Sequence, residues 1–494
     1  MQREELSQRM VKRCKSMFLG IKLLEDDLRG GKNFKQLQRT IDEAPDRLEN
    51  IYDRNWERIT NLREHSRCRA FAILRWTAFS PQPLTVAAIT EALFLANEES
   101  DDLSCDELPD SIDDVYVKTE ISDLCGSLVE IRKAESDTSL GIATLHLAHF
   151  SVRQYILCHM LSSTGELIGN ERLRLAHEAI QKNVLVKTCL RYLDSPRASE
   201  LELSQTCLKT KGMVSAFRQY ATWMWFKRIQ RNVANSKEII SLANRFFRTR
   251  NQNWERWRED LDTGIINVVT IQHTAKIKSG NRLFYASLIR CLETVTYLLD
   301  EMRLDVNHGD ESKRTALFAA SFVGWTHGVA YLLRGGADVT MRNNKGLTAL
   351  DVAACHASAD MAKLIIEKGA ITMAKGGPCG DTPLHRASMA GSVEVTASLL
   401  DMGVDPNAWD KCGYTPLHNA AITGNDEVAK QLIESGDDIE ATAPSGFRPL
   451  SVASLHGSVN IAKVLLDKGT FGIKLHIILL LIFKTFRIKF EIIK

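Results

Sequence analysis

The sequence predicts a mainly α-helical protein that ends in a solenoid of short helical repeats. One pattern recurs five times in its 494 residues at a spacing of 33 or 34, and the copies begin at Thr315, Thr348, Thr382, Thr415 and Arg448. Each copy continues with two adjacent small residues, a small helix-breaking residue, an aliphatic pair and a glycine. A period of this length indicates one supersecondary unit per copy, and each unit buries its apolar face by stacking on its neighbours.

The start of each copy is typical of an ankyrin repeat, in which a β-turn precedes two antiparallel helices. The third and fourth copies begin with Thr-Pro-Leu-His. Thr382 and Thr415 are expected to cap the first helix, because a threonine hydroxyl accepts a hydrogen bond from the free amides there. His385 and His418 are expected to hydrogen-bond the backbone of a neighbouring repeat, as framework residues and not as ligands or bases.

The first helix of the regular copies is expected to end at a glycine with positive φ: Gly391, Gly424 and Gly457. Ala357 takes that place in the second copy, where the turn is expected to be less regular. A weaker, sixth unit precedes the five copies, with Arg290 at the glycine position. Since the terminal units of a solenoid diverge from the others, an array of about six repeats is predicted over residues 279–470.

The composition indicates a chain from a reducing compartment. The net charge of +2 gives no overall field that would attract nucleic acid or a membrane. The cysteines form no Cys-x-x-Cys pair, so neither a zinc site nor a disulfide framework is expected. Cys379 and Cys412, at the same position of adjacent copies, are expected to be free thiols. The N-terminus has no apolar run of the kind a secretory signal needs, and a cytoplasmic location is therefore predicted.

Residues 67–160 are predicted to form a second module with the element order of a winged helix. Thr85 is expected to cap a helix that begins at Val86 and that exposes Glu91. Two strands are predicted at 128–131 and 144–150, and Ser151 is expected to cap a closing helix. The helix after Thr85 carries no Lys or Arg, so nucleic-acid binding is not expected.

Five short segments of this part resemble a known family. They are residues 17–19, 44–52, 73–85, 149–156 and the pair 189–193 with 217–223. In this order they are similar to the stretch that follows the nucleotide-binding NACHT core in fungal NLR-like STAND proteins. That stretch contains a winged helix often labelled after GPI inositol-deacylases. The resemblance implies that residues 1–66 are the end of a NACHT module and that residues 161–278 are an α-helical linker.

No enzyme chemistry, cofactor or metal is predicted. The Gly-x-x-x-x-Gly-Lys-Ser/Thr loop that holds phosphates is missing, and so is the Gly-x-Ser-x-Gly motif of a nucleophilic serine. His146, His149 and His159 are predicted to be core or surface side chains and not a metal site, because residues three apart on a strand face opposite sides.

The predicted function is a non-enzymatic scaffold or sensor that captures a protein partner, in NLR-like signalling or non-self recognition as the resemblance implies. The alternative is a C-terminal fragment of an ATP-dependent STAND switch without its nucleotide-binding core. No small-molecule substrate, nucleic acid or transmembrane segment is expected.

The turn tips and the exposed face of the first helices form the binding surface of such arrays. Eight variable positions there are predicted to contact the partner: Asp381, Met389, Trp409, Lys411, Tyr414, Ile422, Phe447 and His456. The competing interpretation is that Trp409 and Phe447 merely pack on neighbouring turns.

Two further segments have unusual composition. Residues 471–494 contain little besides Ile, Leu, Lys, Phe and Arg, and are predicted to be an aberrant or disordered apolar tail. A translated non-coding stretch is favoured there over an interfacial helix or a strand. Residues 245–258 form a basic and aromatic cluster. Its rings are expected to pack against the first repeat while its arginines stay in solvent.

Overall fold

The computed structural model describes residues 48–94, 109, 112–133, 141–159, 171–195, 216–229, 237–248, 252–268, 281–356 and 358–469. They divide into two compact units, one up to residue 271 and one from residue 272 onward. The predictions for residues 1–47, for the turn at Ala357 and for the tail at 471–494 lie outside the described residues. No helix within the described ranges is long and apolar enough to cross a membrane.

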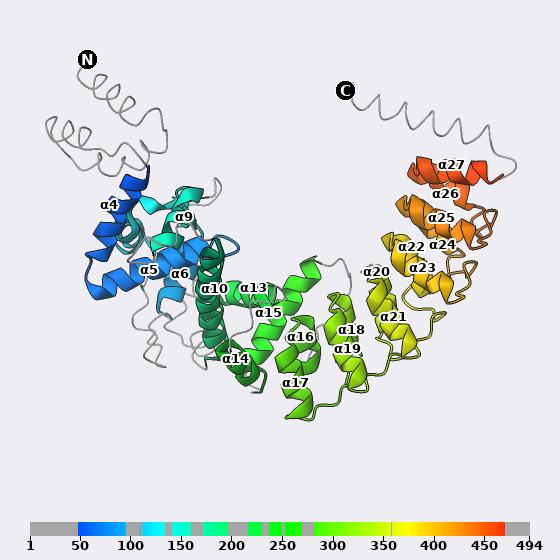
Figure 1. Cartoon of the computed structure of the whole chain (residues 1–494), viewed down its shortest axis with the longest axis horizontal. Helices are drawn as coiled ribbons and strands as arrows, with labels where there is room; N and C mark the ends of the chain where they lie inside the picture. Colours follow the sequence, from blue (N-terminus) through cyan, green and yellow to red (C-terminus); the bar gives the residue numbers. More distant parts are fainter. Residues whose placement is uncertain are drawn as a thin grey trace, which may run out of the picture. The chain divides into compact units, whose positions relative to one another are not determined.

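The N-terminal unit consists of helices and one small sheet (Figure 1). Its elements are α4 (Leu48–Thr60), α5 (Glu64–Phe79), α6 (Val86–Phe94), α7 (Asp114–Val117), the π-helix η2 (Lys118–Ser122), α8 (Asp123–Cys125), the 3-10 helix η3 (Gly126–Leu128), β1 (Val129–Arg132), β2 (Thr144–Leu147), α9 (Phe150–His159), α10 (Glu171–Asp194), α13 (Ala216–Ile229), α14 (Lys237–Arg248) and α15 (Gln252–Val268).

The two predicted strands are present and pair with each other. β1 and β2 run antiparallel, with Val129 opposite Leu147 and Arg132 opposite Thr144. Thr85 caps α6 as expected, since its hydroxyl accepts a hydrogen bond from the amide of Ala88 at 3.1 Å. The second strand is shorter than predicted, because α9 already begins at Phe150.

Glu91 is buried, and the expectation that it faces solvent is wrong. Its side chain lies on α6 at 5% exposure. One carboxylate oxygen accepts a hydrogen bond from the Tyr192 hydroxyl at 2.5 Å, and the other accepts from the backbone amide of Phe217 at 3.0 Å. This amide lies in the first turn of α13, where backbone N–H groups lack helical partners and attract a negative charge. One carboxylate therefore ties α6 to α10 and to α13.

The aromatic side chains of residues 245–258 pack within the N-terminal unit. Trp225 of α13 meets Trp257 of α15 with ring centroids 5.2 Å apart, and Trp257 meets Trp254 at 4.9 Å. The rings of Phe246 and Phe247 complete the cluster. The prediction of solvated arginines is wrong for Arg258, which is 2% exposed and pairs with Glu255 at 2.9 Å.

The C-terminal unit is a series of helix pairs. They are α16 (Arg282–Leu288), α17 (Leu292–Asp300), α18 (Ala316–Phe322), α19 (Thr326–Arg334), α20 (Ala349–Cys355), α21 (Ala359–Glu367), α22 (Pro383–Ala390), α23 (Val393–Asp401), α24 (Pro416–Thr423), α25 (Asp426–Glu434), α26 (Pro449–His456) and α27 (Val459–Asp467).

These pairs stack side by side into an array of two layers (Figure 1). The first helices, from α16 to α26, pack on one another, and the second helices, from α19 to α27, pack on one another behind them. The small residues of each pair lie in the first layer: Ala353, Ala387, Ala420 and Ala453 are buried. Small side chains let neighbouring helices approach closely. The predicted fold class, mainly α-helical with a C-terminal repeat solenoid, is confirmed.

The predicted helix ends are confirmed as well. Gly391, Gly424 and Gly457 have φ values of 72°, 78° and 74°. This left-handed conformation ends a helix and costs a glycine little, because glycine has no Cβ. Arg290 adopts φ 60° at the equivalent position of the first unit. The first unit therefore keeps the same helix-ending turn, although an arginine adopts a positive φ less readily than a glycine does.

Candidate functional site

Buried histidines fasten each regular unit to the loop of the next. The Nδ1 of His385 accepts a hydrogen bond from the amide of Thr382 at 3.3 Å, so the ring proton is on Nε2. That Nε2 donates to the backbone carbonyl oxygen of Tyr414 at 3.0 Å. His418 repeats the arrangement and donates to the carbonyl oxygen of Phe447 at 3.2 Å. Both histidines are framework residues, as expected from the sequence.

Burial lowers the pKa of both rings, since the charged imidazolium would lose its hydration. The pKa of His385 is therefore below its ordinary value near 6.5. The neutral ring is also the only form that can accept the bond from Thr382, because a protonated Nδ1 is a donor. Burial and hydrogen bonding thus select the same protonation state.

The loops that carry the predicted contact residues have a defined shape. The carboxylate of Asp410 accepts a hydrogen bond from the amide of Tyr414 at 2.8 Å and closes the turn. The amide of Lys411 donates to the carbonyl oxygen of Cys379 in the preceding loop at 2.7 Å. Successive loops are therefore hydrogen-bonded to one another. Cys379 and Cys412 are free and exposed, as expected.

The structure places the eight predicted contact residues in three environments. Five are exposed: Met389, Trp409, Lys411, Phe447 and His456. Tyr414 and Ile422 are half-buried, and Asp381 is buried. The exposed apolar members keep 48% (Met389), 39% (Trp409) and 40% (Phe447) of their surface in water.

Asp381 differs from the expectation, because it is a structural residue of its loop. Its carboxylate is 3.0 Å from a guanidinium nitrogen of Arg386, which also lies 3.5 Å from Asp351. Burial raises the pKa of Asp381, and the charge of Arg386 opposes that rise. The acidic side chain was visible in the sequence, but its partner five residues later on α22 was not singled out.

One exposed residue of this surface was missed. Leu455 lies seven positions after Arg448, as Met389 lies seven after Thr382 and Ile422 seven after Thr415. It is 55% exposed. The repeat period itself identifies it, because equivalent positions of stacked units lie in one row. Met389, Ile422 and Leu455 therefore form an apolar row along α22, α24 and α26, beside which His456 lies.

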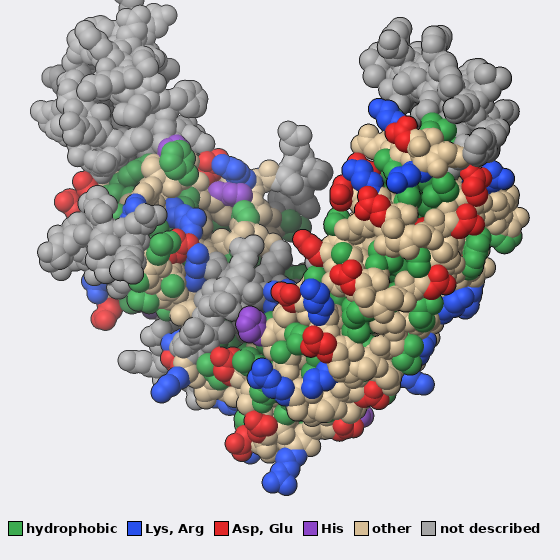
Figure 2. Space-filling view, turned by 45° about the vertical axis from the view of Figure 1, so that its right-hand side comes forward, with side chains coloured by type: hydrophobic (Ala, Val, Ile, Leu, Met, Phe, Trp, Pro, Cys, Tyr) green, Lys and Arg blue, Asp and Glu red, His purple; other side chains and the backbone are tan. Residues whose placement is uncertain are grey.

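The aromatic residues of the loop before α24 lie against a framework histidine. The rings of Tyr414 and Trp409 have their centroids 5.3 Å and 6.4 Å from that of His418. Trp409 nevertheless keeps more than a third of its surface exposed. On the face of the array seen in Figure 2, acidic, basic and apolar side chains are interspersed. Across the described residues, no three His, Cys, Asp or Glu side chains are grouped as a metal site would require.

Comparison with known families agrees with this geometry. A family model described as ankyrin repeats in three copies matches residues 283–376 and 384–476. The C-terminal array consists of ankyrin repeats. The sequence prediction of this repeat type is therefore confirmed.

The individual relatives match this chain over short stretches. This chain is 31% identical to the palmitoyltransferase ZDHHC17 of Danio rerio over 104 aligned residues. The aligned stretch covers 21% of this chain and 17% of that protein. Over another 104-residue alignment this chain is 32% identical to an ankyrin repeat protein of Rickettsia felis, covering 21% and 34% respectively. The similarity to the palmitoyltransferases lies in the ankyrin region. The chain spans about a third or less of the length of each of these two relatives.

Proposed function

We propose that this protein is a non-enzymatic interaction protein that captures a protein partner on the exposed surface of its ankyrin array. The proposed contact surface comprises the apolar row Met389, Ile422 and Leu455 with the loop residues Trp409, Lys411, Tyr414, Phe447 and His456. Aromatic and aliphatic side chains beside charged ones are the composition of binding hot spots.

The observation that supports this proposal most is the exposure of Trp409 and Phe447 on loops that the framework holds in place. The His418 ring bonds the backbone of Phe447, and Asp410 closes the turn that carries Trp409. A loop held in one conformation loses little further entropy on binding. These aromatic side chains are therefore available to a partner on a prepared surface.

The N-terminal unit supports a second part of the proposal. Helices α5 and α6, the short helical segments from α7 to η3, the antiparallel pair β1 and β2, and the closing helix α9 follow one another between Glu64 and His159, which is compatible with the winged helix proposed for residues 67–160. Together with the α-helical stretch that leads to the array, this order favours a cytoplasmic protein of the fungal NLR-like type, in which the array is the sensing part.

The test compares three baits in a pull-down from lysate with quantitative mass spectrometry. Wild type is compared with Trp409→Ala/Tyr414→Ala, and with a control pair, Met373→Ala/Met402→Ala, whose side chains are similarly exposed elsewhere on the array. We expect partners held by the wild type and the control to be lost from the first variant, a weakening of about 2 kcal/mol or more. Equal capture by all three folded baits would refute this surface.

A further inference from the structure

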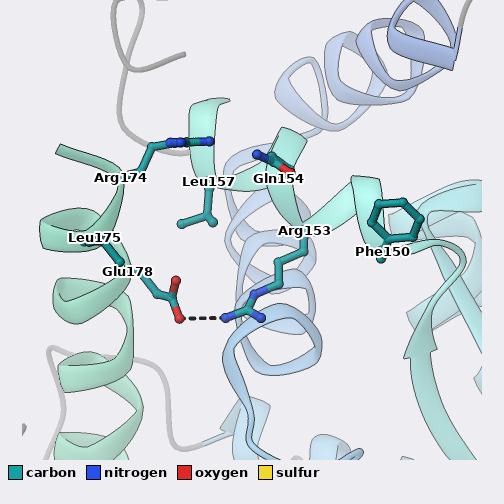
Figure 3. Close-up of a pocket in the computed structure, with 7 residues that line it drawn as sticks. All are labelled: Phe150, Arg153, Gln154, Leu157, Arg174, Leu175 and Glu178. Carbon is teal, nitrogen blue, oxygen red and sulfur yellow. Dashed lines mark hydrogen bonds and ion pairs between the residues drawn. The ribbon is translucent and has the colours of Figure 1, made fainter. Parts of the chain in front are cut away.

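The N-terminal unit carries a second surface feature, independent of the array. Helices α9 and α10 border an open groove of about 360 Å³ (Figure 3). Its apolar part comes from both helices: Phe150 and Leu157 from α9, and Leu175 from α10. Phe150 and Leu175 are 78% and 60% exposed, whereas Leu157 is 9% exposed and lies deeper in the groove. Two large apolar side chains left in water on one groove indicate a surface that a partner covers.

The charged side chains that line the groove carry more positive than negative charge. Arg153 pairs with Glu178 at 2.6 Å, and Glu178 also pairs with Lys182 one turn further along α10. The negative charge of Glu178 is therefore already matched by two cations. Arg174 lines the same groove and adds a positive charge (Figure 3).

Arg174 lacks the partners that a guanidinium requires. Within the described part of the chain it forms no hydrogen bond or ion pair, and its Nε is buried without an acceptor. A buried donor without an acceptor is costly, and a guanidinium is satisfied best by a carboxylate that accepts two parallel bonds. Gln154, exposed at the groove, has an amide that bonds to no other described residue and can pair with a peptide backbone.

We propose that this groove binds a peptide segment of a partner protein in which a carboxylate side chain lies beside a bulky apolar one. The carboxylate accepts hydrogen bonds from Arg174, and the apolar side chain enters between Phe150 and Leu175 above Leu157.

The openness of the groove favours a peptide over a small molecule. Sites for small ligands enclose most of the ligand surface. Here two of the three apolar side chains are more than half exposed, so the groove offers a surface for a chain laid across two helices. Because the site lies in the N-terminal unit, it does not depend on the ankyrin surface proposed above.

The first test selects peptides from a random displayed library on the full-length protein, with counter-selection on the Arg174→Glu variant. We expect the enriched sequences to share an Asp or Glu within a few positions of Phe, Leu, Ile or Trp. Absence of enrichment, enrichment of sequences without an acidic residue, or equal binding to the counter-selection variant would each overturn the proposal.

The second test measures the affinity of one selected peptide by fluorescence polarisation. We expect Arg174→Gln and Leu175→Ser each to weaken binding about tenfold or more, as for loss of a charge-assisted hydrogen bond or of an apolar anchor. Lys237→Gln, which removes an exposed cation from the first turn of α14, is the control and should bind as wild type. Thermal unfolding identifies any variant that fails to fold.

A double-mutant cycle assigns the contact to Arg174. Replacing the acidic residue of the peptide with its amide should weaken binding to the wild type as much as Arg174→Gln does, with little additional loss when both changes are combined. The affinity of the wild type should also fall with added salt, and that of Arg174→Gln should respond much less. Additive losses in the cycle would contradict the proposed pairing.

Discussion

The Nε2 of His385 lies 3.0 Å from the backbone carbonyl oxygen of Tyr414, so a side chain of the unit that begins at Thr382 holds the loop that leads into the unit that begins at Thr415. The Nδ1 of the same ring accepts a hydrogen bond from the backbone amide of Thr382, and Thr382 is the N-cap of the helix α22 that carries His385. A single neutral imidazole thus satisfies one backbone donor and one backbone acceptor in two different units. Stability of neighbouring units is coupled through such contacts.

His385→Ala should therefore destabilise the array by about 2–4 kcal/mol, because it leaves two buried backbone groups unsatisfied and opens a cavity. Loss of hydrogen-exchange protection in α22 and α24 is the measurement. His456→Ala removes an exposed imidazole and should change protection by less than about 0.5 kcal/mol. Similar effects of the two substitutions would contradict the role of His385.

The lowered pKa of His385 and His418 predicts a pH dependence. Because the folded state favours the neutral ring, this contribution is fully present above the unfolded pKa near 6.5 and is lost as the pH falls below it. Protection in α22 and α24, corrected for intrinsic exchange, should decline between pH 6.5 and pH 5 in the wild type. In a His385→Asn/His418→Asn variant, protection should decline less over the same pH range. An unchanged decline would show that other titratable groups cause the pH dependence.

Leu417 gives a test of the array itself. It is fully buried in α24, so Leu417→Ala should cost about 2–5 kcal/mol through lost burial and a cavity. Nearest-neighbour coupling should extend the loss of exchange protection to α22 and α26. Ile422→Ala, at a half-buried position of the same helix, is the control and should cost clearly less. Confinement of the effect to α24 would argue against a coupled solenoid.

Asp437 is a carboxylate in an apolar position. It follows the glycine that ends its unit, where the two preceding units have Ala370 and Val404, both buried. Asp437 is 7% exposed, and among the described residues only the neighbouring backbone amide of Asp438 favours its charged form. Burial, with the nearby charges of Asp438 and Asp405, raises its pKa to about 8.

Asp437→Ala should therefore stabilise the array. Because the folded pKa is above the unfolded value of 3.8, the folded state favours the protonated acid, and stability falls as the pH rises from about 4 to about 8. The substitution should raise the free energy of unfolding little near pH 4 and by at most about 6 kcal/mol above pH 8. Exchange protection in α25 and α27 at the two pH values is the measurement. Asp360→Ala, at an exposed position of α21 whose charge does not act on Asp437, should show no such pH-dependent gain.

Glu91 gives the corresponding test in the N-terminal unit. Glu91→Ala should cost about 2–4 kcal/mol, because Tyr192 and the amide of Phe217 both lose their buried acceptor. Glu91→Gln keeps one acceptor oxygen and should cost less. Urea unfolding followed by tryptophan fluorescence should resolve this order, since Trp76 and Trp225 are buried in the same unit. Equal stability of wild type and Glu91→Ala would show that the bonds contribute nothing net.

The array was predictable from the sequence because its contacts are local and periodic. Thr382, His385 and Gly391 each act within a unit or on its neighbour, so their roles repeat every 33 or 34 residues. The strand pair at Val129–Arg132 and Thr144–Leu147 was also evident from its apolar alternation. The row of Met389, Ile422 and Leu455 was accessible by the same period.

Glu91, whose environment was predicted wrongly, lies outside the repeats. Its burial depends on residues far away in the sequence, which the repeat spacing does not identify. Glu91 is buried because Tyr192 and Phe217 approach from helices about a hundred residues later. The groove between α9 and α10 was likewise not anticipated, since Phe150 was assigned to a strand and Arg174 carries no motif. The burial of Glu91 and the groove between α9 and α10 both result from packing between helices that are separate in the sequence.

The histidine bonds to Tyr414 and Phe447 end on main-chain carbonyl oxygens and not on side chains. Any residue type at these two positions would present the same oxygen to the imidazole. Side chains at the loop tips are therefore free to diversify without changing the bond that holds the loop. New partner preferences can arise at positions 414 and 447 by single substitutions, while the scaffold beneath them stays the same.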